Sequence, residues 1–412
     1  MKIGAFARQF GIPVDTIRYY VDNGILLTEK INNQHVFDEK CVRDMELVLE
    51  LKRMRFSILE IQKMLSFLRV TNLSDPQDEL LFLEWLAKKQ HLLEQEVASL
   101  QQAIGVITQK RGSFPRNQAQ ESRSLGIPLP CFSWFCCPDC GKSLALNHAR
   151  VMHNQVFHGE LECACGYGCT IEEGIVVAPS ANRSTPGSLQ TDNPRQEFVS
   201  NTDPLYVNFS QKPVEWFRKR LRPGGAKTQG ILLEIGTGLG FFLATFLENL
   251  GENGWYIATD ASLAFLQYNK KVLERSGKNP NVLFLAADVT RLPLRQRLVH
   301  YVVDYFGTTQ FSWERGMLPL SKVVPLLRDG GEWLGSYFFV PEPYRFAAGH
   351  ETRNTLFRLS TIEKMMGSLQ VLSMRNLGET ESLGEWENHL PPNGRMGLAV
   401  FHARKEAAPG TK

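Results

Sequence analysis

The stretch Lys2–Gly24, KIGAFARQFGIPVDTIRYYVDNG, predicts two short helices joined by a tight turn. One apolar helical face is indicated by four residues at i, i+3, i+4, i+7 spacing: Ile3, Phe6, Ala7 and Phe10. Gly11 and Pro13 break this helix, and Asn23-Gly24 is a stop signal for a second helix over 14–22. The pattern fits a helix-turn-helix whose second helix enters the major groove of DNA, and it fits a plain helical hairpin equally well.

The same stretch resembles the MerR family of bacterial transcription regulators. The resemblance is carried by Ala7, Gly11, TIRYY at 16–20 and GIL at 24–26, and it continues through residues 32–37 and LKRMRFSILEI at 51–61. It implies a winged helix-turn-helix over residues 1–72 that binds a two-fold promoter site in double-stranded DNA and contacts RNA polymerase. The wing usually carries a phosphate-binding Arg where this chain has His35. The DNA-binding residues it implies are Thr16, Arg18, Tyr19, Tyr20, Lys30 and His35.

A second periodic stretch follows the helix-turn-helix. Apolar residues alternate three and four positions apart, with one polar Gln in the series: Leu83, Leu86, Gln90, Leu93, Val97, Leu100, Ile104 and Ile107. This heptad seam predicts a long helix over 76–111, either as a coiled coil or as a buried stripe in a helical bundle. The MerR resemblance favours the coiled coil, and with it a homodimer that presents two DNA-binding domains.

Length and composition set the broad class. A chain of 412 residues is too long for one core, which predicts two or three domains. The formal charge of +3 is too small to identify a nucleic-acid partner by itself. No apolar window is long enough for a membrane span, and no signal peptide is recognisable, so we expect a cytoplasmic protein with no membrane partner. Polar, Pro/Gly-containing stretches at 112–130 and 180–203 read as linkers.

Seven of the eight cysteines fall between residues 131 and 169. Cys137 and Cys140 form a CxxC knuckle followed by Gly. A second cluster follows after 22 intervening residues: Cys163, Cys165 and Cys169. In a cytosolic protein, two such clusters fit a tetrahedral zinc site of four thiolates better than they fit disulfides.

Residues 131–179 are similar to zinc ribbons found beside some methyltransferase domains. Those ribbons run from a CPxC knuckle to a second pair and then to an Ile-x-x-Gly-Ile strand, here 171–175. Their second pair is usually CxxC, where this chain has CxC. The zinc ligands expected are therefore Cys137, Cys140 and Cys165, with Cys163 as the fourth, Cys169 as its alternative and His158 a more distant one. A further hypothesis is that the spare thiols, namely Cys131, Cys136 and one thiol of the second cluster, sense a metal or an oxidant.

The stretch Gly230–Gly240, GILLEIGTGLG, predicts a buried strand, a Gly-rich turn and a helix over 241–250. Glycines allow close backbone approach, and a helix N-terminus favours an anionic group. Further strands are expected at 255–259, 282–288 and 302–304, and 327–334 is expected to contain a helix end, a turn and a fifth strand. Alternating strands and helices over 204–405 predict an α/β doubly wound, Rossmann-like domain.

This ordered set looks like a class I S-adenosylmethionine-dependent methyltransferase. The resemblance implies that the methionine and ribose are bound by the first turn, the ribose also by Asp260, and the adenine by Asp288 with Val289. The first-turn residues are Glu234, Gly236, Gly238 and Gly240. A doubly wound domain that binds NAD, or no ligand, is the plainer alternative.

The methyl acceptor is less well defined. The region 204–405 contains no Cys, which excludes covalent catalysis through a thiolate. The fourth strand ends in DYFG at 304–307 and not in the Pro-Pro-aromatic turn associated with methylation of exocyclic amines. Candidate bases are Asp304, Tyr305 and His350.

Three hypotheses for the second half follow. It could methylate a small molecule, it could bind S-adenosylmethionine as a signal, or the whole protein could be an RNA methyltransferase with an accessory helix-turn-helix.

Overall fold

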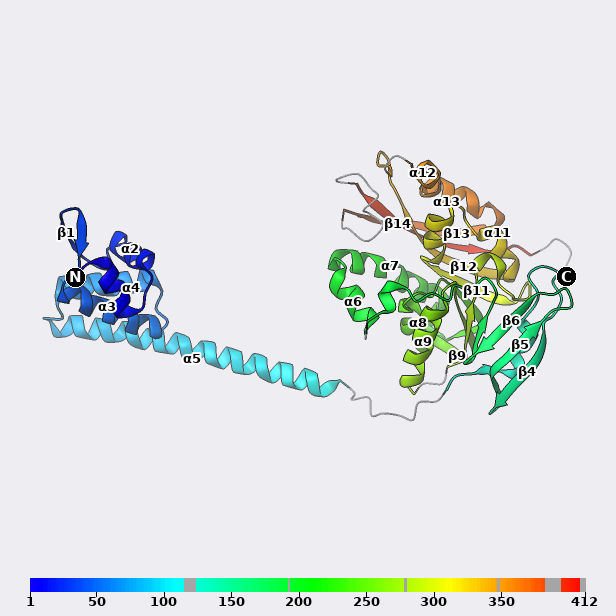
Figure 1. The fold of residues 1–412 in the computed structure, drawn as a ribbon, viewed down its shortest axis with the longest axis horizontal. Coiled ribbons are helices and arrows are strands. Elements are labelled where there is room, and N and C mark those ends of the chain that lie inside the picture. Colours follow the sequence, from blue (N-terminus) through cyan, green and yellow to red (C-terminus); the bar gives the residue numbers. More distant parts are fainter. Residues whose placement is uncertain (115–123, 192, 278–279, 347–348, 382–393, 408–412) are drawn as a thin grey trace. The chain divides into compact units, whose positions relative to one another are not determined.

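The computed structural model describes residues 1–114, 124–191, 193–277, 280–346, 349–381 and 394–407. The chain divides into two compact units, Met1–Arg116 and Asn117–Lys412 (Figure 1). Within the residues so described, no helix combines the length and the apolarity needed to cross a lipid bilayer.

The N-terminal unit consists of helices and one small hairpin. Its elements are α1 Ile3–Phe10, α2 Val14–Asp22, β1 Glu29–Ile31, β2 Gln34–Val36, α3 Glu39–Arg53, α4 Ile58–Thr71 and α5 Pro76–Ser113. The two short helices and the long helix expected from the sequence are confirmed. Gly11 ends α1 in the left-handed region at φ 64°, a conformation that glycine adopts without strain. Ser57 and Glu60 form a reciprocal capping box at the start of α4.

The core of this unit gathers apolar side chains from α1 to α4. The rings of Phe6 and Phe37 stack with centroids 4.4 Å apart, which packs α1 against the segment after β2. The Arg69 guanidinium donates to the carbonyl oxygen of Gly24 (2.9 Å) and to the carboxylate of Asp44 (2.7 Å). Arg69 therefore ties α4 to α3 and to the turn that ends α2.

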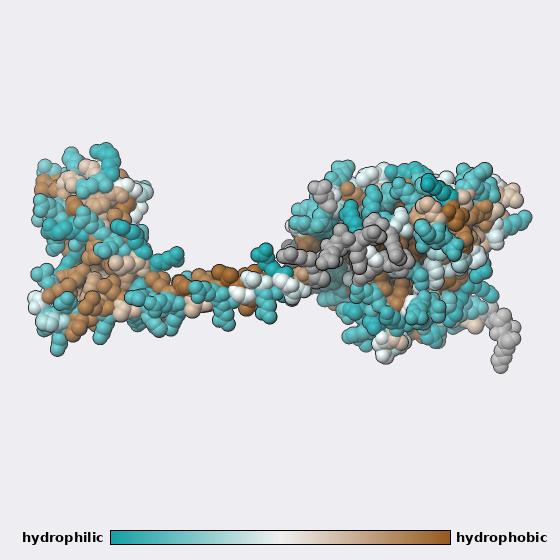
Figure 2. Space-filling view, turned by 90° about the horizontal axis from the view of Figure 1, so that it is seen from below, coloured by the Kyte–Doolittle hydropathy of each residue, from teal (hydrophilic) through white to brown (hydrophobic). Residues whose placement is uncertain are grey.

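Helix α5 contributes no buried residue in the single chain. Along its second half Val97, Leu100, Ile104 and Ile107 are each more than half exposed, and hydrophobic colouring follows the helix in Figure 2. Exposing so many apolar side chains on one helix is unfavourable in water.

The C-terminal unit is built on one mixed sheet (Figure 1). Its central strand order is β13-β14-β12-β11-β8-β9-β10. The pairs from β12 to β10 are parallel, and β14 runs antiparallel to both neighbours. The strands are β8 Thr228–Ile235, β9 Leu250–Asp260, β10 Val282–Ala286, β11 Val299–Tyr305, β12 Leu327–Phe339, β13 Gln370–Thr380 and β14 Met396–Arg404.

The cysteine-rich segment extends this sheet. Strand β7 (Ile175–Val177) pairs in parallel with β10, and the sheet continues antiparallel through β6 (Gly168–Glu172) and β5 (Gln155–Glu162) to β4 (Ala145–Met152) and β3 (Ile127–Pro128). The single strand expected at 171–175 is instead divided between the end of β6 and the start of β7, with a tight turn at 173–174 between them. Gly174 (φ 79°) makes this turn because a Cβ there would lie 2.4 Å from the Leu125 carbonyl oxygen.

Helices cover both faces of the sheet. One face packs against α7 (Pro204–Leu221), α8 (Phe241–Phe246) and α9 (Leu263–Arg275). The other packs against α11 (Leu320–Val323), α12 (Glu351–Leu356) and α13 (Leu359–Met365). The short helices α6 (Pro194–Asn201) and α10 (Gly307–Arg315) flank the first and fourth strand ends. The doubly wound arrangement expected from the sequence is confirmed.

Two further local expectations were wrong. The α-helix expected over 241–250 ends at Phe246, a 3₁₀ turn covers Leu247–Asn249, and β9 begins at Leu250. The segment beginning at Leu327 is strand throughout, with a bulge after Val299 and Leu327 in the β11–β12 pairing. In both places pairing with a neighbouring strand outweighs the local helical pattern.

Candidate functional site

Helix α2 exposes part of the predicted DNA-binding set. The Arg18 side chain is 62% exposed and forms an ion pair with Asp15 at 2.8 Å, while Tyr19 is half exposed and Thr16 half buried. An ion pair this exposed is weak, so Arg18 is free to exchange Asp15 for another partner.

Tyr20 is buried, whereas its neighbours Arg18 and Tyr19 are exposed. It is 1% exposed, it packs in the core of the unit, and its hydroxyl accepts a hydrogen bond from Lys52 Nζ at 2.8 Å. The sequence contained a signal for this: Tyr20 is three residues from the buried Ile17, on the same helical face.

The wing is the β1–β2 hairpin. Asn32 and Asn33 turn it at φ 51° and 61°, the two positive values that a tight two-residue hairpin turn requires. Lys30 is exposed, and His35 Nδ1 lies 2.6 Å from Thr28 Oγ1. The predicted DNA-binding residues other than Tyr20 therefore lie at least partly on the surface of α2 and the wing.

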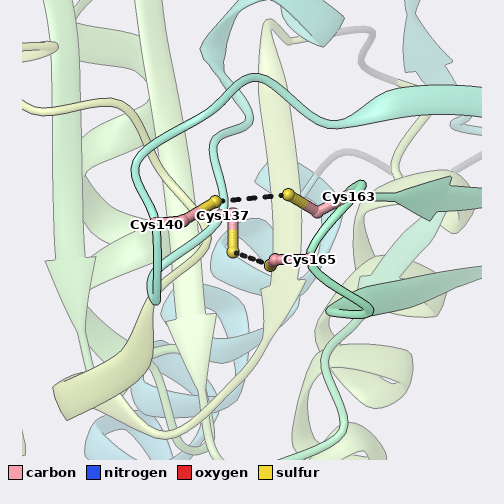
Figure 3. A group of neighbouring side chains, drawn as sticks. All are labelled: Cys137, Cys140, Cys163 and Cys165. Carbon is pink, nitrogen blue, oxygen red and sulfur yellow. Dashed lines mark hydrogen bonds between the residues drawn. The ribbon is translucent and has the colours of Figure 1, made fainter.

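Four cysteine thiols converge in the C-terminal unit (Figure 3). The Sγ atoms of Cys137 and Cys165 are 3.5 Å apart, those of Cys140 and Cys163 are 3.4 Å apart, and all four lie within 4.8 Å of one another. A tetrahedron of four thiolates around Zn²⁺ at ~2.3 Å has sulfurs about 3.8 Å apart. The donor set therefore fits zinc, and this four-cysteine cluster suggests a structural zinc site.

The remaining thiols of this region stand apart. Cys169 Sγ lies 3.4 Å from the Tyr167 hydroxyl, outside the four-thiol cluster. Burial raises the pKa of the Cys131 thiol to about 12 and also raises that of Cys169. Such thiols carry little thiolate at neutral pH, which argues against them as oxidant sensors. His158 lines a separate cavity with Arg150.

The loop between Cys137 and Cys140 is joined to the turn that follows β10 of the central sheet. Asp139, inside the CxxC loop, accepts two hydrogen bonds from Arg291, at 2.6 and 2.8 Å. Arg291 follows Val289 in the 3₁₀ turn after β10. Neither residue was predicted from the sequence, because nothing in the local pattern links positions 152 apart.

The main cavity lies at the carboxyl ends of the central strands. Its volume is about 600 Å³, within the range of small-molecule sites. Five of the predicted cofactor residues line it: Gly236, Gly238, Asp260, Asp288 and Val289. They follow three adjacent strands, β8, β9 and β10. The strand order reverses between β8 and β11, the place where open α/β sheets bind ligands.

Asp260 organises the first turn. Its Oδ2 accepts from the Gly238 N–H and its Oδ1 from the Ser262 N–H, each at 2.8 Å. Burial raises the pKa of this carboxyl. Gly236 is required here because a Cβ would lie 2.7 Å from the Cα of Gly307, at the end of the fourth strand. Two buried hydroxyls on the cavity wall, those of Ser262 and Thr309, have no hydrogen-bond partner among the described residues. A polar ligand could supply the missing partners.

Glu234 and Gly240 are not among the described residues that line this cavity. Glu234 is 1% exposed, and burial raises the pKa of its carboxyl to about 7. Gly240 begins α8 next to Asn269, whose Oδ1 would be 1.9 Å from a Cβ. Glu234 lies in β8 before the Gly-rich turn, and Gly240 lies at the end of the turn, so both residues support the turn without lining the cavity.

The segment 180–203, expected as a linker, contributes to the cavity wall through Asn182, Pro186 and Phe198. In α6, Arg195 Nε donates to the Leu239 carbonyl oxygen at 2.9 Å, so this segment also holds the Gly-rich turn. Its polar composition concealed this role.

The candidate bases are dispersed. Tyr305 lines the cavity, but its hydroxyl donates to the Ser210 carbonyl oxygen and accepts from Gln211 Nε2, each at 2.9 Å. Asp304 is 1% exposed, accepts from the Thr308 N–H and faces a small separate void. His350 lies outside the described cavity lining, 3.1 Å from an Arg353 guanidinium nitrogen.

Two family models match the sequence. The model described as MerR HTH family regulatory protein matches residues 1–68, and the model described as Methyltransferase domain matches residues 232–331. The chain therefore has a MerR helix-turn-helix at its N-terminus, which suggests DNA binding. Its C-terminal unit contains a class I methyltransferase domain, which implies S-adenosylmethionine as cofactor.

Solved structures are also similar to about half of the chain. The MccD protein is 14% identical, with 47% of this chain and 96% of that chain covered and a TM-score of 0.37. The Burkholderia thailandensis 1,6-didemethyltoxoflavin-N1-methyltransferase is 19% identical (56% and 96% covered, TM-score 0.36). A SAM-dependent methyltransferase from Aquifex aeolicus is 16% identical (50% and 97% covered, TM-score 0.32). A search of curated proteins returned no match.

Proposed function

We propose that this chain is a MerR-type transcription regulator that dimerises through α5 and whose C-terminal unit binds S-adenosylmethionine and methylates a small molecule. One observation carries the second half of the proposal. A single cavity is lined at once by the turn after β8 (Gly236, Gly238), the carboxylate after β9 (Asp260) and the pair after β10 (Asp288, Val289). In this arrangement Asp260 holds the ribose, and Asp288 with Val289 meets the adenine.

The regulatory half rests on α2 and α5. Arg18 and Tyr19 project from α2 into solvent, where a DNA groove can accept them. The exposed apolar series along α5 supports a second copy of the helix as its partner, because packing two such seams removes both from water. A dimer presents two recognition helices to a two-fold promoter site. The dimer bound at the promoter then contacts RNA polymerase.

The test is calorimetric titration of S-adenosylmethionine into the full chain. We expect micromolar affinity, weakened by about 10- to 100-fold in Asp260→Asn, because the amide cannot replace a carboxylate toward hydroxyl and N–H donors. Glu363→Gln, an exposed carboxyl on α13 outside the cavity lining, is the matched control and should bind normally. A folded protein that does not bind the cofactor would overturn the proposal.

An RNA methyltransferase is the second candidate. The observation in its favour is a cavity of about 340 Å³ between the ribbon strands and α9, which gathers four basic side chains: Arg150, His158, Lys270 and Lys271. Glu173 and Glu274 lie in the same cavity and reduce its attraction for phosphate. A regulator should retain a discrete promoter fragment in competition with structured RNA, whereas an RNA enzyme should prefer the RNA.

A further inference from the structure

The main cavity has two chemically different sides. Its carboxylates Asp260 and Asp288 follow β9 and β10, and Glu314 acts electrostatically on Asp260. The opposite side, formed by β11, β12 and α7, is aromatic. There Phe306 stacks on Phe338 with centroids 4.5 Å apart and planes 9° apart, and Tyr206 stacks on Phe338 at 5.9 Å. The cofactor residues occupy the first side, so the aromatic side is left for the methyl acceptor.

Phe306 is held in place by an uncommon backbone. Its φ is 64°, in the left-handed region that a bulky residue rarely adopts. The next residue must be glycine, because a Cβ on Gly307 would lie 2.0 Å from the Ile235 carbonyl oxygen. This close approach fixes the Phe306 ring beside the turn that follows β8. The conformation is stabilised by the stacking on Phe338 within a small apolar cluster.

The aromatic side offers no group suited to removing a proton. Among the described residues that line the cavity there is no histidine, lysine or cysteine. The Tyr305 hydroxyl is already bonded to Ser210 and Gln211, and burial raises its pKa. Asp304 faces a different void. The carboxylates that line the cavity, Asp260, Asp288 and Glu314, belong to the cofactor side. The aromatic side therefore suits an acceptor that is nucleophilic without losing a proton in the reaction.

We propose that the cavity accepts a neutral, planar aromatic nitrogen heterocycle between the Phe306 side and the cofactor, and that its ring nitrogen is the methyl acceptor. This inference rests on the proposed function. The nitrogen lone pair forms the N–CH₃ bond as the S–CH₃ bond breaks and its electron pair returns to sulfur. The positive charge passes from the sulfonium to the ring nitrogen, the co-product is neutral S-adenosylhomocysteine, and no proton is released.

The aromatic walls suit this charge movement. Aromatic faces attract cations, so the rings of Phe306, Phe338 and Tyr206 favour the cationic N-methyl product and the charge that develops on the way to it. They also stack on a flat ring. The unpartnered hydroxyl of Thr309 adds one polar contact for a ring substituent.

The first test measures binding without turnover. Isoquinoline is titrated calorimetrically into the full chain saturated with S-adenosylhomocysteine. We expect isoquinoline to bind the unmodified protein and to bind Phe306→Gly at least 10-fold more weakly. This variant removes the ring, and glycine adopts the positive φ without strain. The affinity for S-adenosylhomocysteine should change less than twofold. Tyr19→Ala in the other unit is the control and should bind isoquinoline normally. Equal isoquinoline affinity in the Phe306→Gly variant and the unmodified protein would overturn the proposal.

The second test measures methyl transfer. The full chain is incubated with methyl-deuterated S-adenosylmethionine and either isoquinoline or 1-naphthol, and the products are identified by mass spectrometry. We expect N-methylisoquinolinium and no O-methylated naphthol, since the naphthol hydroxyl must lose a proton. Cofactor binding with no isoquinoline product, or with equal methylation of both probes, would overturn this inference and leave the proposed function standing. Absence of cofactor binding would overturn both.

Discussion

Helix α2 and the main cavity place their candidate residues in opposite environments. Arg18 and Tyr19 of α2 point into solvent and make few contacts within the chain. Asp260 and Gly236 of the cavity are enclosed by neighbouring backbone. Substitutions of exposed residues such as Arg18 and Tyr19 should therefore change binding and leave folding almost unaffected, whereas substitutions of buried residues should change folding first.

Loss of a zinc ligand should have the largest effect. Structural zinc contributes roughly 10–16 kcal/mol of apparent binding free energy in small zinc domains, and that energy stabilises the fold. Cys140→Ser should therefore reduce zinc content, measured by mass spectrometry, from one per chain to near zero and lower the thermal midpoint of the C-terminal unit. Cys169→Ser is the matched control and should retain zinc. Full zinc in the Cys140 variant would show that Cys140 is not a ligand, and loss of zinc in the Cys169 variant would place Cys169 among the ligands.

The two adjacent tyrosines of α2 should have different effects when replaced: Tyr20 should affect stability, and Tyr19 should affect DNA binding. Tyr20→Ala removes a fully buried ring and should lower the free energy of unfolding, measured in urea, by about 3–5 kcal/mol. Tyr19→Ala should change it by less than about 0.5 kcal/mol and weaken DNA binding instead. Similar unfolding curves for both variants would contradict the burial of Tyr20.

Asp304 should show that a buried charge can oppose stability. Burial raises the pKa of its carboxyl from 3.8 to about 6, so the folded protein binds the proton more tightly than the unfolded chain. Its stabilising contribution is complete below pH 3.8 and is lost as the pH rises through 6. Asp304→Asn keeps an acceptor for the Thr308 N–H, so at pH 8 it should be more stable than the unmodified protein by up to about 3 kcal/mol.

The gain should shrink to nearly zero at pH 4, which thermal unfolding at both pH values would measure. Glu363→Gln, which removes an exposed carboxyl on α13, is the control for the loss of one negative charge. A variant that is less stable at pH 8 would mean that the charged form of Asp304 is favoured.

The smallest effect is expected at Arg18. Arg18→Ala should weaken binding to the cognate promoter fragment by about 1–3 kcal/mol if the side chain reads a base, with no change in the urea midpoint. Arg111→Ala, near the end of α5, is the control. A uniform loss across DNA sequences, with a shallower salt dependence, would instead place Arg18 on a phosphate.

Much of the fold was predictable because its signals are local. Periodicity located α1, α2 and α5, and the alternation of apolar strands with Gly-rich turns predicted the doubly wound sheet. The expected zinc set, Cys137, Cys140, Cys163 and Cys165, is the set of thiols that converge. Local signals failed where pairing with a distant strand decides the conformation, as at Leu250 and Leu327.

The classes of element, the spacing of the cysteines and the order of the turns after β8, β9 and β10 follow from the sequence alone, because each depends on residues near one another in the chain. Which side chains are exposed to a ligand depends on the tertiary structure. It buried Tyr20 against Lys52, joined Asp139 to Arg291 and brought the 180–203 segment to the cavity wall. It also directed Asp304 away from the cavity while placing Phe306 beside the turn after β8. Burial and long-range contact depend on how whole elements pack, and no local pattern encodes that packing.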